Sequence, residues 1–434
     1  MTPEVSFRAA SLVWWRIGLL SFGGPAGQIA LMHRVLVDEK RWIDEARFLH
    51  ALNYCMLLPG PEAQQLATYI GWLLHGVRGG FVAGLLFILP GAFAIFLLSY
   101  LYVQWGEVAA VEGVFFGLKA AVLAIVCQAL LRIAARTLTG TLQRWLALFG
   151  FLALFVFSLP FPLVIFAAGL FAFALVRMRG APAALEVPNA PPLSAANIQS
   201  TRIAALLCLL LWLGTLLGLH LLLGGLHPLT QIADFFSRMA VVTFGGAYAV
   251  LSYVAQQAVE HYHWLLPGEM LDGLGLAETT PGPLILVTQF VGFMGAWREL
   301  GHESSLLAAA AGAMLTTWVT FLPCFLWIFA GAPYVEKLRE YPALRESLGA
   351  ISAVVVGVIA NLALWFALHF LFTDTLRVQA GPIDILLPQL ESIAWPAVLL
   401  ASGAFILLFV LRLSMLMLLA ACALLGSAWI VLFT

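Results

Sequence analysis

The chain has 434 residues, of which 62% are hydrophobic and 10% are charged, and its formal net charge is −1 at pH 7. A soluble domain carries about 25% charged residues. The composition therefore excludes a water-soluble globular protein and indicates that the lipid bilayer surrounds most of the chain. The near-neutral charge also argues against a nucleic acid as a partner.

Four long stretches contain no Asp, Glu, Lys or Arg. They cover residues 81–101, 203–223, 304–330 and 347–373. A helix needs about 20 residues to cross the hydrocarbon layer, and the alternating strand pattern of a membrane barrel is absent. The sequence predicts an all-α integral membrane protein with about 10–14 transmembrane or re-entrant helices.

The first candidate site ends an apolar segment near the N-terminus. Arg16 lies inside this segment, and 21–24 read Ser-Phe-Gly-Gly, followed by Pro25 and Gln28. Pro25 suits the first position of a new helix, and the amide groups and dipole of such a helix start form an anion site. Ser21 and Gln28 add neutral donors. An arginine at membrane depth favours a function, although Arg16 lies early enough to extend to the membrane surface.

The next interruption is Pro59-Gly60-Pro61, followed by Glu62 and Gln65. Proline in a helix interior costs about 3 kcal/mol, so the triplet breaks the helix and Pro61 begins another. Glu62 falls in the first turn, where the helix dipole stabilises its charged form. It is either a helix cap or the proton carrier of a coupled transporter. Gln65 either lines the path of the transported substrate or holds neighbouring helices together through its polar side chain.

Both interruptions recur later in the chain at a constant offset of 222 residues. Arg16 matches Arg238, 21–24 match Thr243-Phe244-Gly245-Gly246, and 59–61 match Pro281-Gly282-Pro283. The sequence thus predicts two tandem repeats with broken helices: a first repeat at 1–177, a linker at 178–202, and a second repeat at 203–434. Two features differ between the repeats. Ala247 replaces Pro25, and Glu278, another candidate proton carrier, matches Met56.

The charges of the loops favour an inverted orientation of the two repeats. Lys and Arg in short loops prefer the cytoplasmic side. The loop at 33–47 has four of them and its counterpart at 256–270 has none, whereas the loop at 103–112 has none and its counterpart at 331–346 contains Lys337, Arg339 and Arg345. Inverted repeats with interrupted helices are typical of secondary transporters. Broken backbone at membrane depth lines a cavity or is buried in protein, so we expect the breaks to meet.

Other groups give less specific signals. Lys119 is a lone cation inside the apolar span 113–131, and either a position at the membrane surface or a function explains it. The five cysteines are scattered singly with no CxxC spacing, so we expect no disulfide framework, metal or cofactor. A membrane-embedded enzyme is the alternative from a different class, but HExxH, GxSxG and phosphate-loop motifs are missing.

The motifs SFGGPAGQIA, Trp42, LLPGPEAQQLATYIG, FGGAYAVL and ETTPGPLILVTQFVGF resemble the chromate transporter (CHR) family in its two-domain form. The resemblance implies a multi-pass protein of the bacterial inner membrane that exports chromate, as an antiporter driven by the proton motive force, and confers chromate resistance. Sulfate is a look-alike substrate. A transporter or channel for sulfate or another inorganic anion is the alternative, and a homo-oligomer stays open because small-residue runs such as AAAAGAML pack within or between subunits.

The motifs and the repeat together predict the site. The expected substrate-binding residues are Arg16, Ser21, Phe22, Gly23, Gly24, Pro25, Gln28, Pro59, Gly60, Pro61, Gln65, Arg238, Thr243, Phe244, Gly245, Gly246, Thr279, Pro281, Gly282 and Pro283. Glu62 and Glu278 are the candidates for proton coupling.

Overall fold

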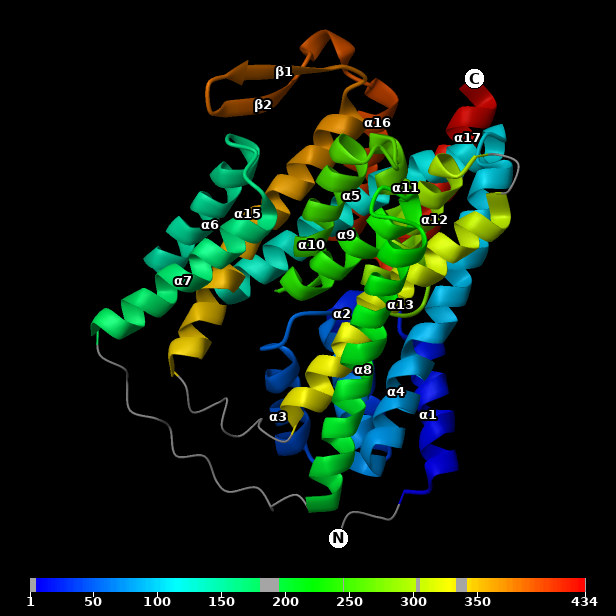
Figure 1. Ribbon diagram of the computed structural model, residues 1–434. Coiled ribbons are helices and arrows are strands. Elements are labelled where there is room, and N and C mark those ends of the chain that lie inside the picture. Colours follow the sequence, from blue (N-terminus) through cyan, green and yellow to red (C-terminus); the bar gives the residue numbers. More distant parts are fainter. Residues whose placement is uncertain (1–4, 180–194, 245, 302–304, 333–341, 434) are drawn as a thin grey trace. The chain divides into compact units, whose positions relative to one another are not determined.

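The fold is helical, as a computed structural model shows (Figure 1). The structure describes residues 5–179, 195–244, 246–301, 305–332 and 342–433. Within these ranges seven helices are long and apolar enough to cross a membrane, and two shorter apolar helices cover Thr141–Phe155 and Trp395–Val410. The prediction of an all-α membrane protein is confirmed.

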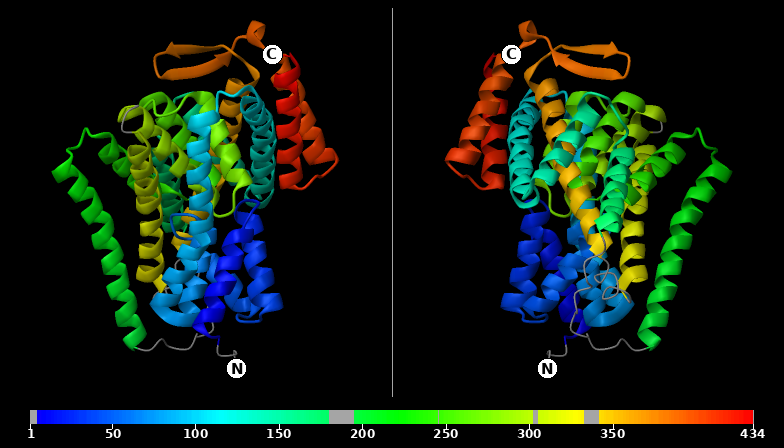
Figure 2. Two further views of the ribbon diagram at one scale, coloured as in Figure 1. Left: turned by 90° about the vertical axis from the view of Figure 1, so that its right-hand side faces the viewer. Right: turned by 90° about the vertical axis from the view of Figure 1, so that its left-hand side faces the viewer.

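The chain forms two compact units, and each unit takes segments from both sequence repeats. Unit 1 comprises 1–97, 173–247 and 280–346, and unit 2 comprises 98–172, 248–279 and 347–434. The helices of unit 1 are α1 (Phe7–Leu20), α2 (Gly24–His33), α3 (Glu45–Cys55), most of α4 (Glu62–Trp105), α8 (Ala195–Leu222), α9 (Pro228–Val242), α12 (Val287–Glu299) and α13 (Ser305–Gly331). Those of unit 2 are α5 (Ala109–Thr137), α6 (Thr141–Phe155), most of α7 (Phe161–Arg179), most of α10 (Ala247–Ala255), α11 (Pro267–Thr279), most of α15 (Pro342–Leu371), α16 (Trp395–Phe405) and α17 (Met415–Phe433). In unit 1, α8 packs along α13, and in unit 2, α17 lies beside α5 (Figure 2).

The order and bounds of the elements recur with the offset of 222 residues. Helix α1 ends at Leu20 and α9 ends at Val242, and a π-helical turn at Arg34–Glu39 has its equivalent at Gln256–His261. Helix α4 contains a sharp kink at His75 and Gly76, so it consists of two helices, and the second repeat has α12 and α13 at this place. The two segments of α4 approach each other closely, and so do α12 and α13. A Cβ on Gly71 would lie 2.4 Å from the Gly79 carbonyl oxygen, and a Cβ on Gly312 would lie 2.4 Å from the Gly292 carbonyl oxygen.

The broken helices of the two repeats meet in unit 1 through a reciprocal pair of hydrogen bonds. The Gly60 amide donates to the Thr243 carbonyl oxygen at 2.8 Å, and the Gly282 amide donates to the Ser21 carbonyl oxygen at 3.0 Å. Each Pro-Gly-Pro triplet is therefore bonded to the residue that follows α1 or α9 of the other repeat. We call the described residues of 21–24, 59–61, 243–244, 246 and 281–283 the junction.

Glycine is required at the centre of each triplet. Gly60 has a φ of 125° and Gly282 a φ of 92°, and a residue with a Cβ rarely adopts such values. Residues of the other repeat also pack closely against each triplet. A Cβ on Gly60 would lie 2.9 Å from Cys324 Sγ of the second repeat, and a Cβ on Gly91 of the first repeat would lie 2.2 Å from the Pro281 carbonyl oxygen of the second triplet. Because Leu89-Pro90-Gly91 and Leu322-Pro323-Cys324 are repeat equivalents, the packing is reciprocal as well.

Unit 2 contains a two-stranded antiparallel sheet of β1 (Thr375–Ala380) and β2 (Ile383–Pro388). The sequence analysis did not predict this hairpin. Gly381, with a φ of 60°, forms the turn, and β-branched residues favour the extended backbone on both sides of it. Arg377 donates two hydrogen bonds to the Asp384 carboxylate, at 2.8 and 2.6 Å. The Asp384 amide donates to the Val156 carbonyl oxygen at 2.8 Å, which fastens the hairpin to the end of α6.

Three sequence-based predictions fall partly or wholly outside the described residues. Gly245 and the loop residues Lys337 and Arg339 are not among the described residues, nor is most of the linker, although its last residues belong to α8. The inverted orientation of the repeats stays a prediction.

We expect Gly60→Ala and Gly282→Ala to destabilise the protein. A side chain at a positive φ costs about 1–3 kcal/mol, and a Cβ on Gly60 would also displace the side chains of Gln65 and Cys324. The melting temperature in detergent should fall by about 2–5 °C. Gly218→Ala is the matched control, because a Cβ at this position of α8 would meet open space. Equal melting temperatures for all three variants would contradict the proposed strain.

The Arg377–Asp384 pair should hold the hairpin in a pH-dependent manner. The hydrogen bonds from Arg377 lower the pKa of Asp384, so the pair stabilises the hairpin above the ordinary Asp pKa, and this stabilisation is lost as the pH falls through the lowered pKa. Arg377 is half exposed, which limits the effect to about 0.2–1 kcal/mol. Arg377→Gln should raise hydrogen exchange in 375–388 about 1.5- to 5-fold near neutral pH. Arg144→Gln, which replaces an exposed arginine of α6, is the control and should leave hydrogen exchange in 375–388 unchanged. If exchange rises equally in both variants, loss of the Arg377–Asp384 pair is not the cause.

Candidate functional site

The hydroxyl groups of the junction stabilise helix ends. Ser21 Oγ donates to the Gly18 carbonyl oxygen at 2.8 Å, and Thr243 Oγ1 donates to the Met239 carbonyl oxygen at 2.6 Å. Both are buried. These hydrogen bonds satisfy carbonyl groups at the C-termini of α1 and α9 that have no partner inside the helix. Both hydroxyl protons are therefore engaged by the fold.

Gln28 joins the two repeats. Its Nε2 donates to the Gly282 carbonyl oxygen at 2.6 Å and lies 3.4 Å from the Ser21 carbonyl oxygen. The side chain is 1% exposed, and its Oε1 has no hydrogen-bond partner within the described part of the chain. The sequence predicted Gln28 as a donor to a ligand, and the structure places its donor group on the backbone of the other repeat.

The start of α2 is an uncapped helix N-terminus. Gly23 and Gly24 have φ values of 89° and 68°, no side chain caps the helix, and Pro25 lies in its first turn. The first amide groups of a helix have no acceptor inside the helix, and together with the dipole they attract an anion. Gly246, with a φ of 95°, precedes α10. That helix begins at Ala247, so the replacement of Pro25 by alanine leaves a glycine turn and a helix start in place.

Two buried amide oxygens, of Gln64 and Gln65, lie in the first segment of α4. Gln65 Nε2 donates to the Pro59 carbonyl oxygen at 2.7 Å, and Gln64 Nε2 donates to Thr68 Oγ1 at 3.0 Å. The Oε1 atoms of both glutamines are buried and have no partner within the described residues. Buried polar atoms of this kind are normally satisfied by water or by a ligand. The sequence pointed to Gln65, and its neighbour Gln64 was missed because nothing in the motif distinguishes the two.

The two arginines do not join the junction. Arg16 is exposed on α1, and the Arg238 side chain is 71% exposed and lies 4.0 Å from Asp234. The remaining predicted residues divide by burial. Those buried are Ser21, Gln28, Gly60, Pro61, Gln65, Thr243, Gly282 and Pro283, and those partly exposed are Phe22, Gly23, Gly24, Pro25, Pro59, Phe244, Gly246, Thr279 and Pro281.

The two candidate proton carriers occupy different environments. Glu62 is partly exposed in the first turn of α4. Glu278 is 2% exposed near the end of α11, and the Tyr248 hydroxyl donates to its Oε1 at 2.6 Å. Glu278 Oε2 has no partner among the described residues. Thr279 Oγ1 donates to the Leu276 carbonyl oxygen at 2.8 Å, so this hydroxyl serves its own helix.

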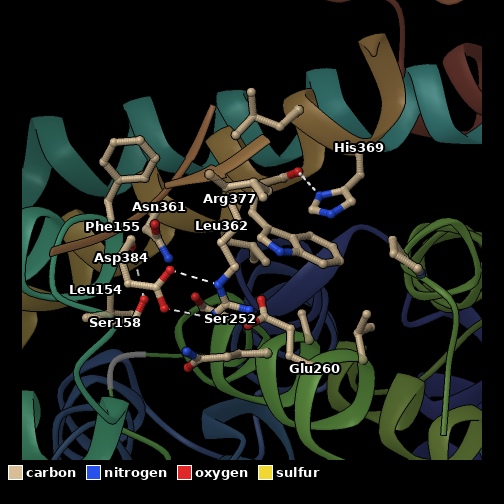
Figure 3. A pocket seen from close by; sticks show the side chains of 17 residues that line it. Leu154, Phe155, Ser158, Ser252, Glu260, Asn361, Leu362, His369, Arg377 and Asp384 are labelled. Atoms are coloured by element: carbon tan, nitrogen blue, oxygen red, sulfur yellow. Dashed lines mark hydrogen bonds and ion pairs between the residues drawn. The ribbon is translucent and has the colours of Figure 1, made fainter. Parts of the chain in front are cut away.

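A cavity of about 250 Å³ lies in unit 2 (Figure 3). Its lining includes Glu260, Asn361, His369, Arg377 and Asp384. Glu260 Oε2 lies 3.8 Å from Arg377, and burial raises the pKa of Glu260 although Arg377 opposes the shift. None of the predicted site residues lines this cavity, because its residues come from elements far apart in the sequence.

Comparisons with known proteins place the chain in a family. The chromate transporter family model matches residues 9–173 and 230–427. The chromate transport protein of Pseudomonas aeruginosa is 33% identical over 360 residues, which cover 82% of this chain and 80% of the relative. The chromate transport protein of Cupriavidus metallidurans is 28% identical over 371 residues, 84% of each chain. The probable chromate transport protein of Synechococcus elongatus is 26% identical over 366 residues, which cover 83% of this chain and 84% of the relative.

No solved structure matches the chain significantly. The family model covers most of the chain, in two regions that each contain a glycine turn and a Pro-Gly-Pro triplet of the junction. The long apolar helices of the chain make it a multi-pass membrane protein. The chain is a member of the chromate transporter family.

Proposed function

We propose that the protein carries chromate, a doubly negative tetrahedral oxyanion, across the bacterial inner membrane. Three relatives that cover more than four-fifths of the chain are named for chromate transport. The observation that carries the proposal is the reciprocal bonding of Gly60 to Thr243 and of Gly282 to Ser21. Two broken helices that meet at one place are the arrangement expected around a substrate site in a transporter with repeated halves.

The oxyanion would bind in unit 1 at the helix starts of the junction. The uncapped start of α2 supplies amide groups and the positive end of a helix dipole, and Gly24 allows a close approach of the anion to the backbone. The Gly60 and Gly282 amides are engaged between the repeats, so their role is to hold the turns in place. Water held by the buried glutamine oxygens would complete the shell around the substrate.

Transport would run outward and depend on the proton motive force. The inside-negative membrane potential alone drives a doubly charged anion out of the cell. Glu278 is the stronger candidate for proton coupling, because it is buried with one oxygen free of protein partners in the described chain, whereas the dipole of α4 favours the charged form of Glu62.

Inverted membrane vesicles from cells that produce the protein test this function. We expect radiolabelled chromate to accumulate in energised vesicles, excess sulfate to compete, and an uncoupler to abolish accumulation. The potential and the pH gradient are collapsed separately with ionophores to identify the driving component. Uptake that only follows the chromate gradient would favour a channel, and transport of sulfate without chromate would favour another anion as the substrate.

The same assay distinguishes the two acids. Glu278→Gln should abolish accumulation driven by the gradient, whereas Glu62→Gln should preserve it. The reverse result would assign coupling to Glu62, and full accumulation in both variants would exclude both acids.

Gln28→Val should reduce chromate transport about tenfold or more, because the carbonyl groups of Gly282 and Ser21 lose a buried hydrogen-bond donor, at a cost of about 1–3 kcal/mol. Valine is a suitable replacement because Val250 occupies the equivalent position of the second repeat. Transport by the variant is compared at equal amounts of membrane-inserted protein. Wild-type rates would show that Gln28 does not position the junction.

A further inference from the structure

Near its end, helix α11 contains a buried carboxylate that is held by a tyrosine of α10. Glu278 is 2% exposed, and Tyr248 is 9% exposed. The Tyr248 hydroxyl donates a hydrogen bond of 2.6 Å to Glu278 Oε1. Both residues belong to the segment 248–279 of unit 2, so the contact lies within one compact unit.

The two oxygens of this carboxylate have different surroundings. Oε1 accepts from Tyr248, whereas Oε2 is buried and has no hydrogen-bond partner among the described residues. In a neutral carboxylic acid one oxygen carries the proton and the other is an acceptor. The donor on Oε1 therefore makes Oε1 the carbonyl oxygen of the neutral acid. Oε2 is the oxygen that is left for a proton.

The repeat shows that the helices form without this pair. With the offset of 222 residues, Tyr248 is equivalent to Ala26 of α2, and Glu278 is equivalent to Met56, which follows α3. Both Ala26 and Met56 are exposed. The acid and its hydrogen-bond donor are thus both present in the second repeat and both missing from the first. Formation of helices at these places does not require a tyrosine–carboxylate pair.

We propose that Tyr248 is a positioning residue that directs the coupling proton to Oε2 of Glu278 and favours the release of this proton; this rests on the proposed role of Glu278 in export. A proton from the outer side bonds to a lone pair of Oε2, and the carboxylate loses its charge. On the inner side the O–H bond breaks, the electron pair stays on Oε2 and the proton passes to water. Tyr248 keeps its own proton, so its hydrogen bond to Oε1 persists in both states.

The hydrogen bond favours release because it is stronger when Glu278 is charged. Hydrogen bonds to an ionised acceptor are about twice as strong as those to a neutral one, and a donor of this kind stabilises the charged form of a carboxyl group. Charge on a buried carboxylate is costly. Tyr248 offsets part of this cost, and each cycle of proton-driven export requires that Glu278 lose its proton again.

Helix α11 packs against α5, and both helices contain other charged groups. These groups are Glu269 and Asp272 of α11 and Lys119 and Arg132 of α5. Lys119 lies 3.3 Å from Asp272, and the charge of Arg132 acts on Tyr248. Tyr248 is the titratable residue that is hydrogen-bonded to Glu278 within the described chain, so removal of its hydroxyl tests this contact.

Infrared difference spectroscopy of the purified full-length protein tests the proposal without transport. The carboxylic C=O band of Glu278 is identified by its absence in Glu278→Gln and is titrated with pH. Tyr248→Phe should raise the frequency of this band, because the C=O group loses its donor, and should move the titration midpoint about 0.5–1 pH unit higher. Tyr100→Phe, which removes a partly exposed tyrosine from unit 2, is the matched control and should titrate like the wild type.

The band and the midpoint decide the proposal. Wild-type values of both in Tyr248→Phe would overturn it, and so would equal shifts in Tyr100→Phe. If Tyr248→Phe does not insert into the membrane, the wild-type band decides alone, because a C=O frequency typical of a carboxylic acid without a hydrogen-bond donor would overturn the proposal.

Chromate accumulation in inverted vesicles separates positioning from a structural role. The medium outside these vesicles corresponds to the cytoplasm, and release of the proton into it becomes harder as its pH falls. Tyr248→Phe should therefore lose accumulation at an external pH about 0.5–1 unit higher than the wild type does. An equal loss at every pH would indicate a structural role and overturn the proposal. Infrared shifts as expected in a protein that accumulates neither chromate nor sulfate would instead overturn the proposed function.

Discussion

The structure of unit 1 depends on two backbone hydrogen bonds, from Gly60 to Thr243 and from Gly282 to Ser21. A helix broken inside a membrane leaves amide and carbonyl groups that lipid cannot satisfy, at a cost of several kcal/mol for each group. Here each repeat supplies the missing partner of the other. The two breaks stabilise each other, and neither is an independent element.

This arrangement determines which polar groups remain for a ligand. The hydroxyls of Ser21 and Thr243 stabilise their own helix ends, and the Gln28 amide bridges the repeats. The start of α2 is left with amide groups that no side chain caps. A site assembled this way would bind an anion through backbone dipoles, and these dipoles need no reorganisation when the anion arrives.

The duplicated elements and the unpaired features have different physical roles. Glycines and prolines at matching positions recur because the backbone of each break requires them. The acids Asp272 and Glu278 have His50 and Met56 as their repeat equivalents, and each acid has one buried oxygen without a partner in the described chain. Because the equivalent helix of the first repeat forms without acids at these positions, formation of the helix does not require these carboxylates.

The sequence by itself determined the class of the protein and the position of its breaks. Hydropathy identifies helices that must lie in lipid, and Pro-Gly-Pro marks a break wherever it occurs, because both effects are local. The tertiary structure decided which groups meet: Gly60 bonds to a residue 183 positions away, the predicted arginines lie on exposed faces, and Lys119 finds Asp272 on another helix. Periodicity and composition cannot specify such pairs, since contacts between distant segments depend on the packing of whole helices.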